Sequence, residues 1–110
     1  MLPRITIITI CYNAASTISR TLRSVQAQTY PHLEYLVIDG ASRDTTLELV
    51  EELAPRAQVY SEPDRGIYDA MNKGLARAAG DYVWYVNAGD ALAKATTVED
   101  LVRATCSGGH

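Results

Sequence analysis

The segment Ile5–Ile10 (ITIITI) is β-branched at every position, and no other segment constrains the fold of this 110-residue chain as strongly. A strand of this composition is apolar on both faces, so it has to be covered on both sides, as in the parallel sheets of α/β proteins. A different pattern follows at once, because Ile18, Leu22 and Val25 recur at helical spacing. The chain therefore begins with a buried strand that leads into an amphipathic helix.

The same alternation of strand and helix continues to the end of the chain. The predicted strands are residues 5–10, 33–38, 57–60 and 81–86. The later helices are predicted from apolar positions at Leu47, Val50 and Leu53, at Ile67, Met71, Leu75 and Ala78, and at Leu101 and Val102. We expect Ser42 to cap the second helix, and Thr96 with Glu99 to form a capping box at the last. The order βαβαβαβα with short connections predicts an α/β fold, with a mainly parallel sheet and helices on both faces.

Composition excludes several classes of protein. The 10 Lys and Arg against 13 Asp and Glu give a net charge of −3, which argues against a broad electrostatic grip on nucleic acid. The longest apolar stretch is much shorter than the ~20 residues of a membrane-spanning helix, and no signal-peptide pattern is present. Two cysteines do not make a disulfide framework. We expect a cytoplasmic protein, with the inner face of the membrane as an alternative location.

Polar side chains follow the predicted strands at the point where each strand ends. The residues concerned are Tyr12 and Asn13, Asp39, Asp64 and Arg65, and Asn87 and Asp90. Because the carboxyl ends of parallel strands meet at one edge of a sheet, these residues are predicted to line a binding crevice there.

Two common nucleotide-binding motifs are absent. No glycine lies between Cys11 and Ile18, which excludes the dinucleotide fingerprint, and the chain has no GxxxxGK[ST] phosphate loop. A ligand with phosphates would need a cation to neutralise them. Mg²⁺ or Mn²⁺, held by one or two carboxylates together with the phosphates, fits the oxygen-rich rim.

Four segments resemble the successive motifs of family-2 glycosyltransferases, which are inverting enzymes with the Rossmann-like GT-A fold. They are 5–13 (ITIITICYN), 37–44 (VIDGASRD), 62–74 (EPDRGIYDAMNKG) and 85–90 (YVNAGD). The resemblance covers about residues 4–92. The third segment most resembles the branch that builds bacterial exopolysaccharide and lipopolysaccharide.

The resemblance implies a site for the nucleotide. Tyr12 would pack against the nucleobase or ribose, with Asn13 beside it, and Asp39 would accept a hydrogen bond from the base, typically the uracil N–H. Asp64 and Arg65 would approach the nucleotide and the sugar. Ordinary structural roles stay open for each, such as a turn-forming Asp39 before glycine and a solvated Arg65.

The resemblance also implies a metal site at Asn87-Ala88-Gly89-Asp90. Asp90 matches the final aspartate of the family's acidic motif and would coordinate Mg²⁺ or Mn²⁺ on the diphosphate of the donor. Asn87 stands where many members have an acid, and it can offer a carbonyl oxygen instead. Gly89 also departs from the common pattern.

By resemblance, residues 1–106 form the donor-binding portion of a GT-A domain and residues 107–110 a tail. The partners implied are a nucleoside-diphosphate sugar, expected to be a UDP-sugar, and, for the complete enzyme, a glycan or lipid-linked acceptor. The general base would lie in an acceptor half that this chain lacks, so we expect little transferase activity from it alone. Glu99 and Asp100 are explained by the first turn of the last helix.

Two alternatives remain open from the sequence. One is a non-catalytic interaction module that forms a homodimer through an open sheet edge. The other is a flavodoxin- or receiver-like domain, although no lysine follows a late strand as a receiver would require.

Overall fold

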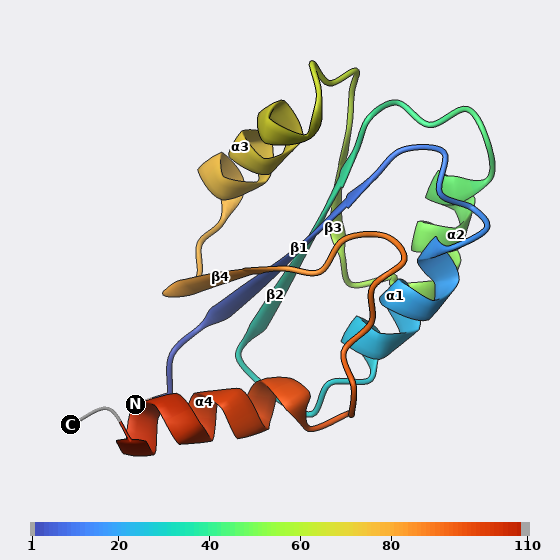
Figure 1. Ribbon diagram of the computed structural model, residues 1–110. Coiled ribbons are helices and arrows are strands. Elements are labelled where there is room, and N and C mark those ends of the chain that lie inside the picture. Colours follow the sequence, from blue (N-terminus) through green and yellow to red (C-terminus); the bar gives the residue numbers. More distant parts are fainter. Residues whose placement is uncertain (1, 109–110) are drawn as a thin grey trace.

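The computed structural model describes residues 2–108, and side chains within 2–105. Four parallel strands form one sheet in the order β3-β2-β1-β4 (Figure 1). The strands are β1 (Ile5–Cys11), β2 (Leu33–Asp39), β3 (Gln58–Ser61) and β4 (Tyr82–Tyr85). Four helices alternate with them: α1 (Ile18–Gln26), α2 (Thr46–Leu53), α3 (Ile67–Arg77) and α4 (Thr97–Gly108). The predicted α/β fold with a parallel sheet is confirmed.

The β-branched run forms β1, which lies inside the sheet. It pairs with β2 along its whole length and with β4 from Ile5 to Ile8. Ile7 and Ile8 are both fully buried, on opposite faces of the strand. The isoleucines of this segment suit a strand covered on both sides, and the buried hydroxyls of Thr6 and Thr9 are hydrogen-bonded to Glu34 and to the Val86 carbonyl.

The helices lie on both sides of the sheet, as Figure 1 shows. On one face, Ile7 packs in a core with Leu22 of α1, Val50 of α2 and Val98 of α4. On the other face, Ile8 and Ile38 pack against Ala70 of α3. The connection through α3 crosses the sheet, so β1 lies at the point where the strand order reverses.

The face that α3 buries differs from the predicted one. Ile67 and Leu75 were expected on its apolar face, yet both are exposed, whereas Ala70 and Gly74 are buried. A Cβ on Gly74 would lie 2.8 Å from Cγ2 of Ile8. The helix therefore contacts the sheet through its smallest residues, which allow an approach that larger side chains would prevent.

The predicted caps were also wrong. Ser42 does not cap α2; Thr45 is its N-cap residue, and Ser42 instead donates hydrogen bonds to Asp39. Glu99 accepts a hydrogen bond from Thr29 at 2.7 Å rather than reaching back to Thr96. In both cases a partner distant in sequence or in the neighbouring loop takes the side chain away from the helix end.

At the C-terminal helix the prediction holds for one residue of two. Val102 is buried, as expected, but Leu101 is about half exposed. Part of the predicted tail continues α4 to Gly108, while Gly109 and His110 lie outside the described residues. Among residues 2–108 no helix combines the length and the apolar character that crossing a bilayer demands.

Candidate functional site

The loops that follow β1, β2, β3 and β4 enclose a hollow of about 800 Å³ at the carboxyl end of the sheet. Residues from all four loops and from the start of α3 line it, including Tyr12, Asn13, Gly40, Asp64, Ile67 and Asn87. Ligands of open parallel sheets bind at this end, next to the point where the strand order reverses. The sequence placed the candidate residues at this edge, and the hollow lies there.

The predicted residues do not all reach the lining. Tyr12, Asn13, Asp64 and Asn87 belong to it, whereas Asp39, Arg65 and Asp90 do not. Tyr12 is 62% exposed, so its ring is open to a ligand that enters the hollow. Arg65 is exposed near the end of the loop that follows β3, and its backbone N–H donates a hydrogen bond of 2.9 Å to the Asp69 carboxylate.

Asp39 is fully buried behind the lining, and its carboxylate is already engaged. Oδ2 accepts hydrogen bonds of 2.8 Å from the Ser42 N–H and from the Ser61 hydroxyl, and Oδ1 accepts one from the Ser42 hydroxyl. The Cys11 thiol donates to Oδ1 at 3.4 Å. Burial and the neighbouring Asp39 charge raise the pKa of the Cys11 thiol well above its usual range, so it stays neutral. In this arrangement Asp39 links the ends of β1 and β3 to the loop that follows β2.

The loops after β1 and β2 hold each other through side-chain-to-backbone hydrogen bonds. The N–H of Asn13 donates to the Ser42 hydroxyl at 2.8 Å, and Oδ1 of Asn13 accepts from the Arg43 N–H at 2.8 Å. Asn13 and Ala41 both have left-handed backbone conformations, with φ of 45° and 63°. This conformation costs free energy for alanine, whereas asparagine adopts it more readily.

Asp64 lies between the hollow and Lys73 of α3. Its Oδ1 is 2.8 Å from Nζ of Lys73, and its side chain is 13% exposed. A Cβ on Gly40 would lie 3.0 Å from Oδ2 of Asp64 and 3.3 Å from the Tyr12 ring. The glycine after β2 therefore leaves the room in which Tyr12 and Asp64 stand.

The sequence analysis assigned no role to Lys73. The sequence did contain one indication of an ion pair at Lys73. This residue stands four positions after Asp69 on the same helix, a spacing that favours such a pair. Its contact with Asp64 depends on how the preceding loop folds back onto α3, and the spacing of the residues does not reveal that.

Asn87 and Asp90 are the ends of a tight turn after β4. The Asp90 N–H donates to the Asn87 carbonyl at 2.9 Å, and Gly89 has the positive φ of 99° that such a turn needs. From α1, the Thr21 hydroxyl donates to the Asp90 carbonyl and accepts from the Gly89 N–H at 3.0 Å. The Asp90 residue is exposed. The turn is thus fixed through its backbone, and the Asp90 carboxylate remains available to a ligand.

Asn87 carries an unsatisfied oxygen. Its Oδ1 is buried, and among the described residues no group donates a hydrogen bond to it. Buried polar atoms without a partner are rare in folded proteins, where water, an ion or a ligand commonly bonds to them. Because Asn87 lines the hollow, a ligand there could supply the missing partner.

The oxygen atoms near the hollow suit a divalent cation only in an open mode of binding. The described residues contain no cluster of three or more His, Cys, Asp or Glu side chains able to hold a metal. Mg²⁺ commonly uses one or two carboxylates together with water and substrate phosphates. Asp90, with the oxygen of Asn87 in the same turn, fits that open mode of binding and does not form a closed protein site.

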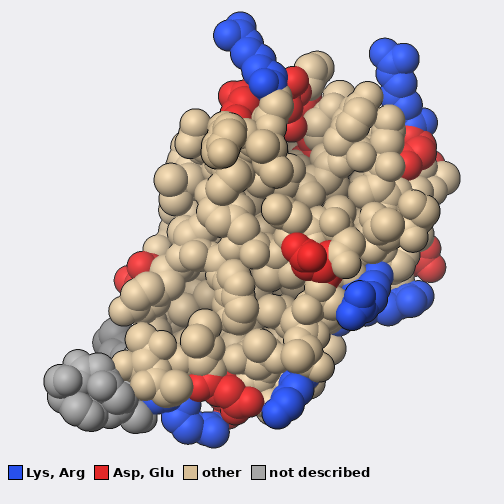
Figure 2. All heavy atoms as spheres, viewed as in Figure 1, with Lys and Arg blue, Asp and Glu red and all other residues tan. Residues whose placement is uncertain are grey.

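Both acidic and basic side chains lie near the carboxyl end of the sheet, where the hollow is (Figure 2). On the face shown in Figure 2, basic side chains have acidic ones close by, and much of the middle of the face is uncharged. The face therefore presents no broad field of a single sign.

Sequence comparisons identify similar proteins. A family model described as "Glycosyl transferase family 2" matches residues 6–110. An uncharacterized glycosyltransferase of Mycobacterium tuberculosis is 39% identical over 104 residues, which cover 93% of this chain and 40% of that protein. A putative teichuronic acid biosynthesis glycosyltransferase of Bacillus subtilis, TuaG, is 37% identical over 92 residues, covering 80% of this chain and 36% of the relative. The chain thus spans about two fifths of the length of these relatives.

Solved structures share the fold. TarS 1-349 of S. aureus, in complex with UDP-GlcNAc, superposes with a TM-score of 0.87 at 25% identity, over 94% of this chain and 31% of that chain. The mannosyltransferase PcManGT from Pyrobaculum calidifontis, in complex with GDP-Man and Mn²⁺, gives a TM-score of 0.82 at 30% identity, over 96% of this chain and 32% of the other.

Proposed function

The chain belongs to glycosyltransferase family 2, and we propose that it binds the nucleoside-diphosphate sugar, a UDP-sugar, from which the sugar is transferred. The observation that carries the proposal is the hollow at the reversal of strand order, which is lined by Tyr12 with its exposed ring and by Asn87, whose Oδ1 has no hydrogen-bond partner among the described residues. Both the UDP-GlcNAc complex and the GDP-Man complex were found among proteins of the same fold.

Each lining side chain has a defined task in this proposal. The exposed ring of Tyr12 stacks on the nucleobase or ribose. Asp64 accepts a hydrogen bond from the nucleoside, and Asn87 Oδ1 accepts one from a ligand hydroxyl or contacts the cation. Asp39 contacts the base only if Ser42 or Ser61 releases it, because both now occupy its oxygens. Asn13 and Arg65 contribute to the proposed site by hydrogen bonds that hold the loops after β1 and β3.

Asp90 is the proposed protein ligand of Mg²⁺ or Mn²⁺, with the remaining positions left to Asn87, water and the diphosphate. A cation held there would supply positive charge to neutralise the departing nucleoside diphosphate. The protein's own contribution is to fix the turn that carries Asp90, which Thr21 holds through its backbone and which begins at Asn87 in the lining of the hollow.

The reaction class proposed is inverting transfer of a hexosyl group to a glycan or lipid-linked acceptor in cell-surface polysaccharide synthesis. The name of TuaG supports the product class. A free, buried Cys11 supports a reducing compartment, the cytoplasm.

The general base of that reaction is proposed to lie outside this chain. Glu99 is engaged by Thr29 and Arg103, and Asp100 by Thr96 and Arg103. Both are on α4, which Figure 1 shows near the opposite end of the sheet from the loops that line the hollow. Neither carboxylate is placed to take a proton from an acceptor at the hollow.

Calorimetric titration with UDP, with and without Mn²⁺, tests the donor site. We expect the wild-type chain to bind UDP more tightly with Mn²⁺, and Asp90→Ala to lose about tenfold or more of that affinity, or about 1.4 kcal/mol. Asp100→Ala is the matched control, because Asp100 is an exposed aspartate on α4 away from the hollow. A folded wild-type chain that fails to bind UDP at millimolar concentration would refute the proposal.

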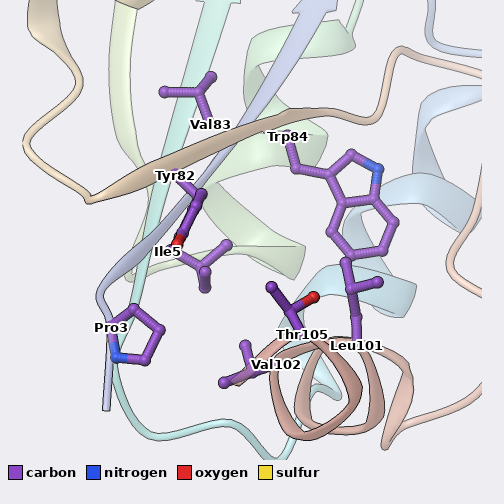
Figure 3. A pocket seen from close by; sticks show the side chains of 8 residues that line it. All are labelled: Pro3, Ile5, Tyr82, Val83, Trp84, Leu101, Val102 and Thr105. Atoms are coloured by element: carbon purple, nitrogen blue, oxygen red, sulfur yellow. The ribbon is translucent and has the colours of Figure 1, made fainter. Parts of the chain in front are cut away.

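An assembly module is the second candidate, and one observation favours it. An apolar hollow of about 290 Å³ lies between β4 and α4, where Figure 3 shows Trp84 and Leu101 pointing toward one another beside Ile5 and Val102. β4 is an edge strand of the described sheet. Exposed edges and apolar patches favour association between chains. Sedimentation equilibrium decides: a mass that rises with concentration, without UDP binding, supports this candidate over the first.

A further inference from the structure

Lys73 of α3 gathers the loop that follows β3. Its ammonium contacts three carboxylates, Asp64 at 2.8 Å and Glu62 and Asp69 at 3.3 Å, and it donates to the Pro63 carbonyl at 2.9 Å. The Lys73 side chain is 20% exposed, so these contacts are better shielded from water than ordinary surface ion pairs. One side chain thus ties the loop that begins at Glu62 to α3, with Asp69 of the same helix as a further partner.

Lys73 contacts only one of the two carboxylate oxygens of Asp64. Lys73 binds Oδ1 of Asp64, whereas among the described residues no donor contacts Oδ2. Oδ2 instead lies on the side of Gly40, which lines the hollow together with Asp64 itself. One oxygen of the carboxylate is therefore held by the protein, and the other remains free to accept a hydrogen bond.

We propose that Lys73 is a positioning residue of the donor site: it holds Oδ1 of Asp64 so that Oδ2 faces the hollow and accepts an N–H or O–H group of the nucleotide. This inference rests on the proposed function. Lys73 does not touch the ligand; it acts through Asp64. Without its ammonium, the carboxylates of Glu62, Asp64 and Asp69 repel one another and also repel an incoming diphosphate.

The other basic side chain near the end of α3 provides a matched control. Arg77 lies on the same helix one turn further on, and its guanidinium stacks over the Tyr60 ring at 4.3 Å. No carboxylate among the described residues pairs with Arg77. Arg77→Met therefore removes a positive charge from α3 without releasing the loop.

The test is the affinity for UDP with Mn²⁺, measured by calorimetry for Lys73→Met, Lys73→Arg, Asp64→Asn and the double variant Asp64→Asn/Lys73→Met. Lys73→Met is expected to weaken binding by about tenfold, the scale of one lost hydrogen bond to a charged group. Lys73→Arg keeps the charge and reach and is expected to recover most of that loss. Arg77→Met is expected to bind like the wild type.

The double variant separates positioning from a general loss of loop structure. If Lys73 acts through Asp64, Lys73→Met costs little further affinity once Asp64 is asparagine. Equal losses in both backgrounds, or wild-type affinity in Lys73→Met, would overturn this inference while the wild type still binds UDP. A wild-type chain that binds no UDP would overturn the proposed function and this inference with it. Thermal melting of each variant identifies any that is unfolded, and Lys73→Arg then carries the comparison.

Discussion

At the scale of single residues, Tyr12 offers the most accessible ring of the hollow. It lines the hollow and is 62% exposed. Stacking of a base on an aromatic side chain contributes about 1–3 kcal/mol in nucleic-acid sites. We therefore expect Tyr12→Ala to weaken UDP binding by about tenfold or more and Tyr12→Phe to keep most of the affinity. Tyr68→Ala is the control, since Tyr68 is 79% exposed and does not line the hollow. Equal losses in both alanine variants would contradict the assignment.

Ala41 has a conformation that suits glycine better. Its φ of 63° lies in the left-handed region, where a Cβ meets the following carbonyl oxygen. Ala41→Gly is expected to raise the free energy of unfolding by about 0.5–1 kcal/mol, after allowing for the greater freedom of glycine in the unfolded chain. Ala76→Gly, at an exposed position in the last turn of α3, should instead lower it, by up to about 1 kcal/mol. Urea denaturation measures both, and a destabilised Ala41→Gly would show that the strain is absent.

At the scale of elements, Gly80 is where the connection from α3 to β4 passes closest to β1. A Cβ on Gly80 would lie 2.5 Å from Oγ1 and 2.8 Å from the backbone N of Thr6, and 2.9 Å from the Arg4 carbonyl. Two of these atoms belong to the backbone, so no rotamer change relieves the contact. Gly80→Ala is expected to destabilise the fold by about 1–3 kcal/mol, and Thr6→Ala should not rescue it. If urea titrations showed that the Gly80→Ala/Thr6→Ala double variant has wild-type stability, the contacts with the backbone atoms of Thr6 and Arg4 would not cause the destabilisation.

Asp44 ties the segment before α2 to the loop after β1. It accepts hydrogen bonds from the Thr46 hydroxyl, from the Thr46 N–H at 3.0 Å and from the Ala15 N–H at 3.1 Å. The Thr46 hydroxyl is the main cause that lowers the pKa of Asp44 below its ordinary value. The resulting stability is present above about pH 4 and is lost as the pH falls through the lowered pKa.

Urea midpoints between about pH 5 and pH 2 measure this contribution. Asp44→Asn should flatten the acid side of the profile relative to the wild type. Glu48→Gln, an exposed acid in the first turn of α2, should leave it unchanged. Parallel wild-type and Asp44→Asn profiles would rule out Asp44 as the titrating group.

The elements show which features are predictable from sequence. The β-branched run predicted β1, and the polar residues after each strand predicted the edge where the hollow lies, because these patterns act within a few residues. The buried face of α3 was not predicted, because contact with Ile8 selects Ala70 and Gly74 over the larger Ile67 and Leu75. Contacts between distant segments decide such details.

The same reason applies to the candidate site. The side chains that surround Asp39 come from the ends of β1 and β3 and from the loop after β2, with Cys11 28 residues before it and Ser61 22 residues after it. Lys73 meets Asp64 nine residues away only because the loop folds back. Spacing predicted where the residues gather, while their engagement with one another required the folded chain.

At the scale of the whole molecule, stability is expected to be graded across the sheet. β1 is bonded on both sides and almost wholly buried, whereas β3 is a four-residue edge strand that is mostly exposed. We expect the amides of β1 to exchange with deuterium only on global unfolding, and those of β3 at least about tenfold faster by local opening. Hydrogen exchange followed by NMR measures this, and equal protection of the two strands would show that the sheet opens as one unit.

The strand order also determines the sequence of events during folding. β1 meets β2 across short separations, such as the 28 residues from Thr6 to Glu34, but reaches the segment of β4 only across 77 residues, as from Arg4 to Asp81. Closing the longer loop is slower, so the docking of β4 is expected to be a late kinetic step. The turn that carries Asp90 follows β4 directly. The turn with Asp90, the proposed metal ligand, is therefore expected to form last, on a β1–β2 framework that is already in place.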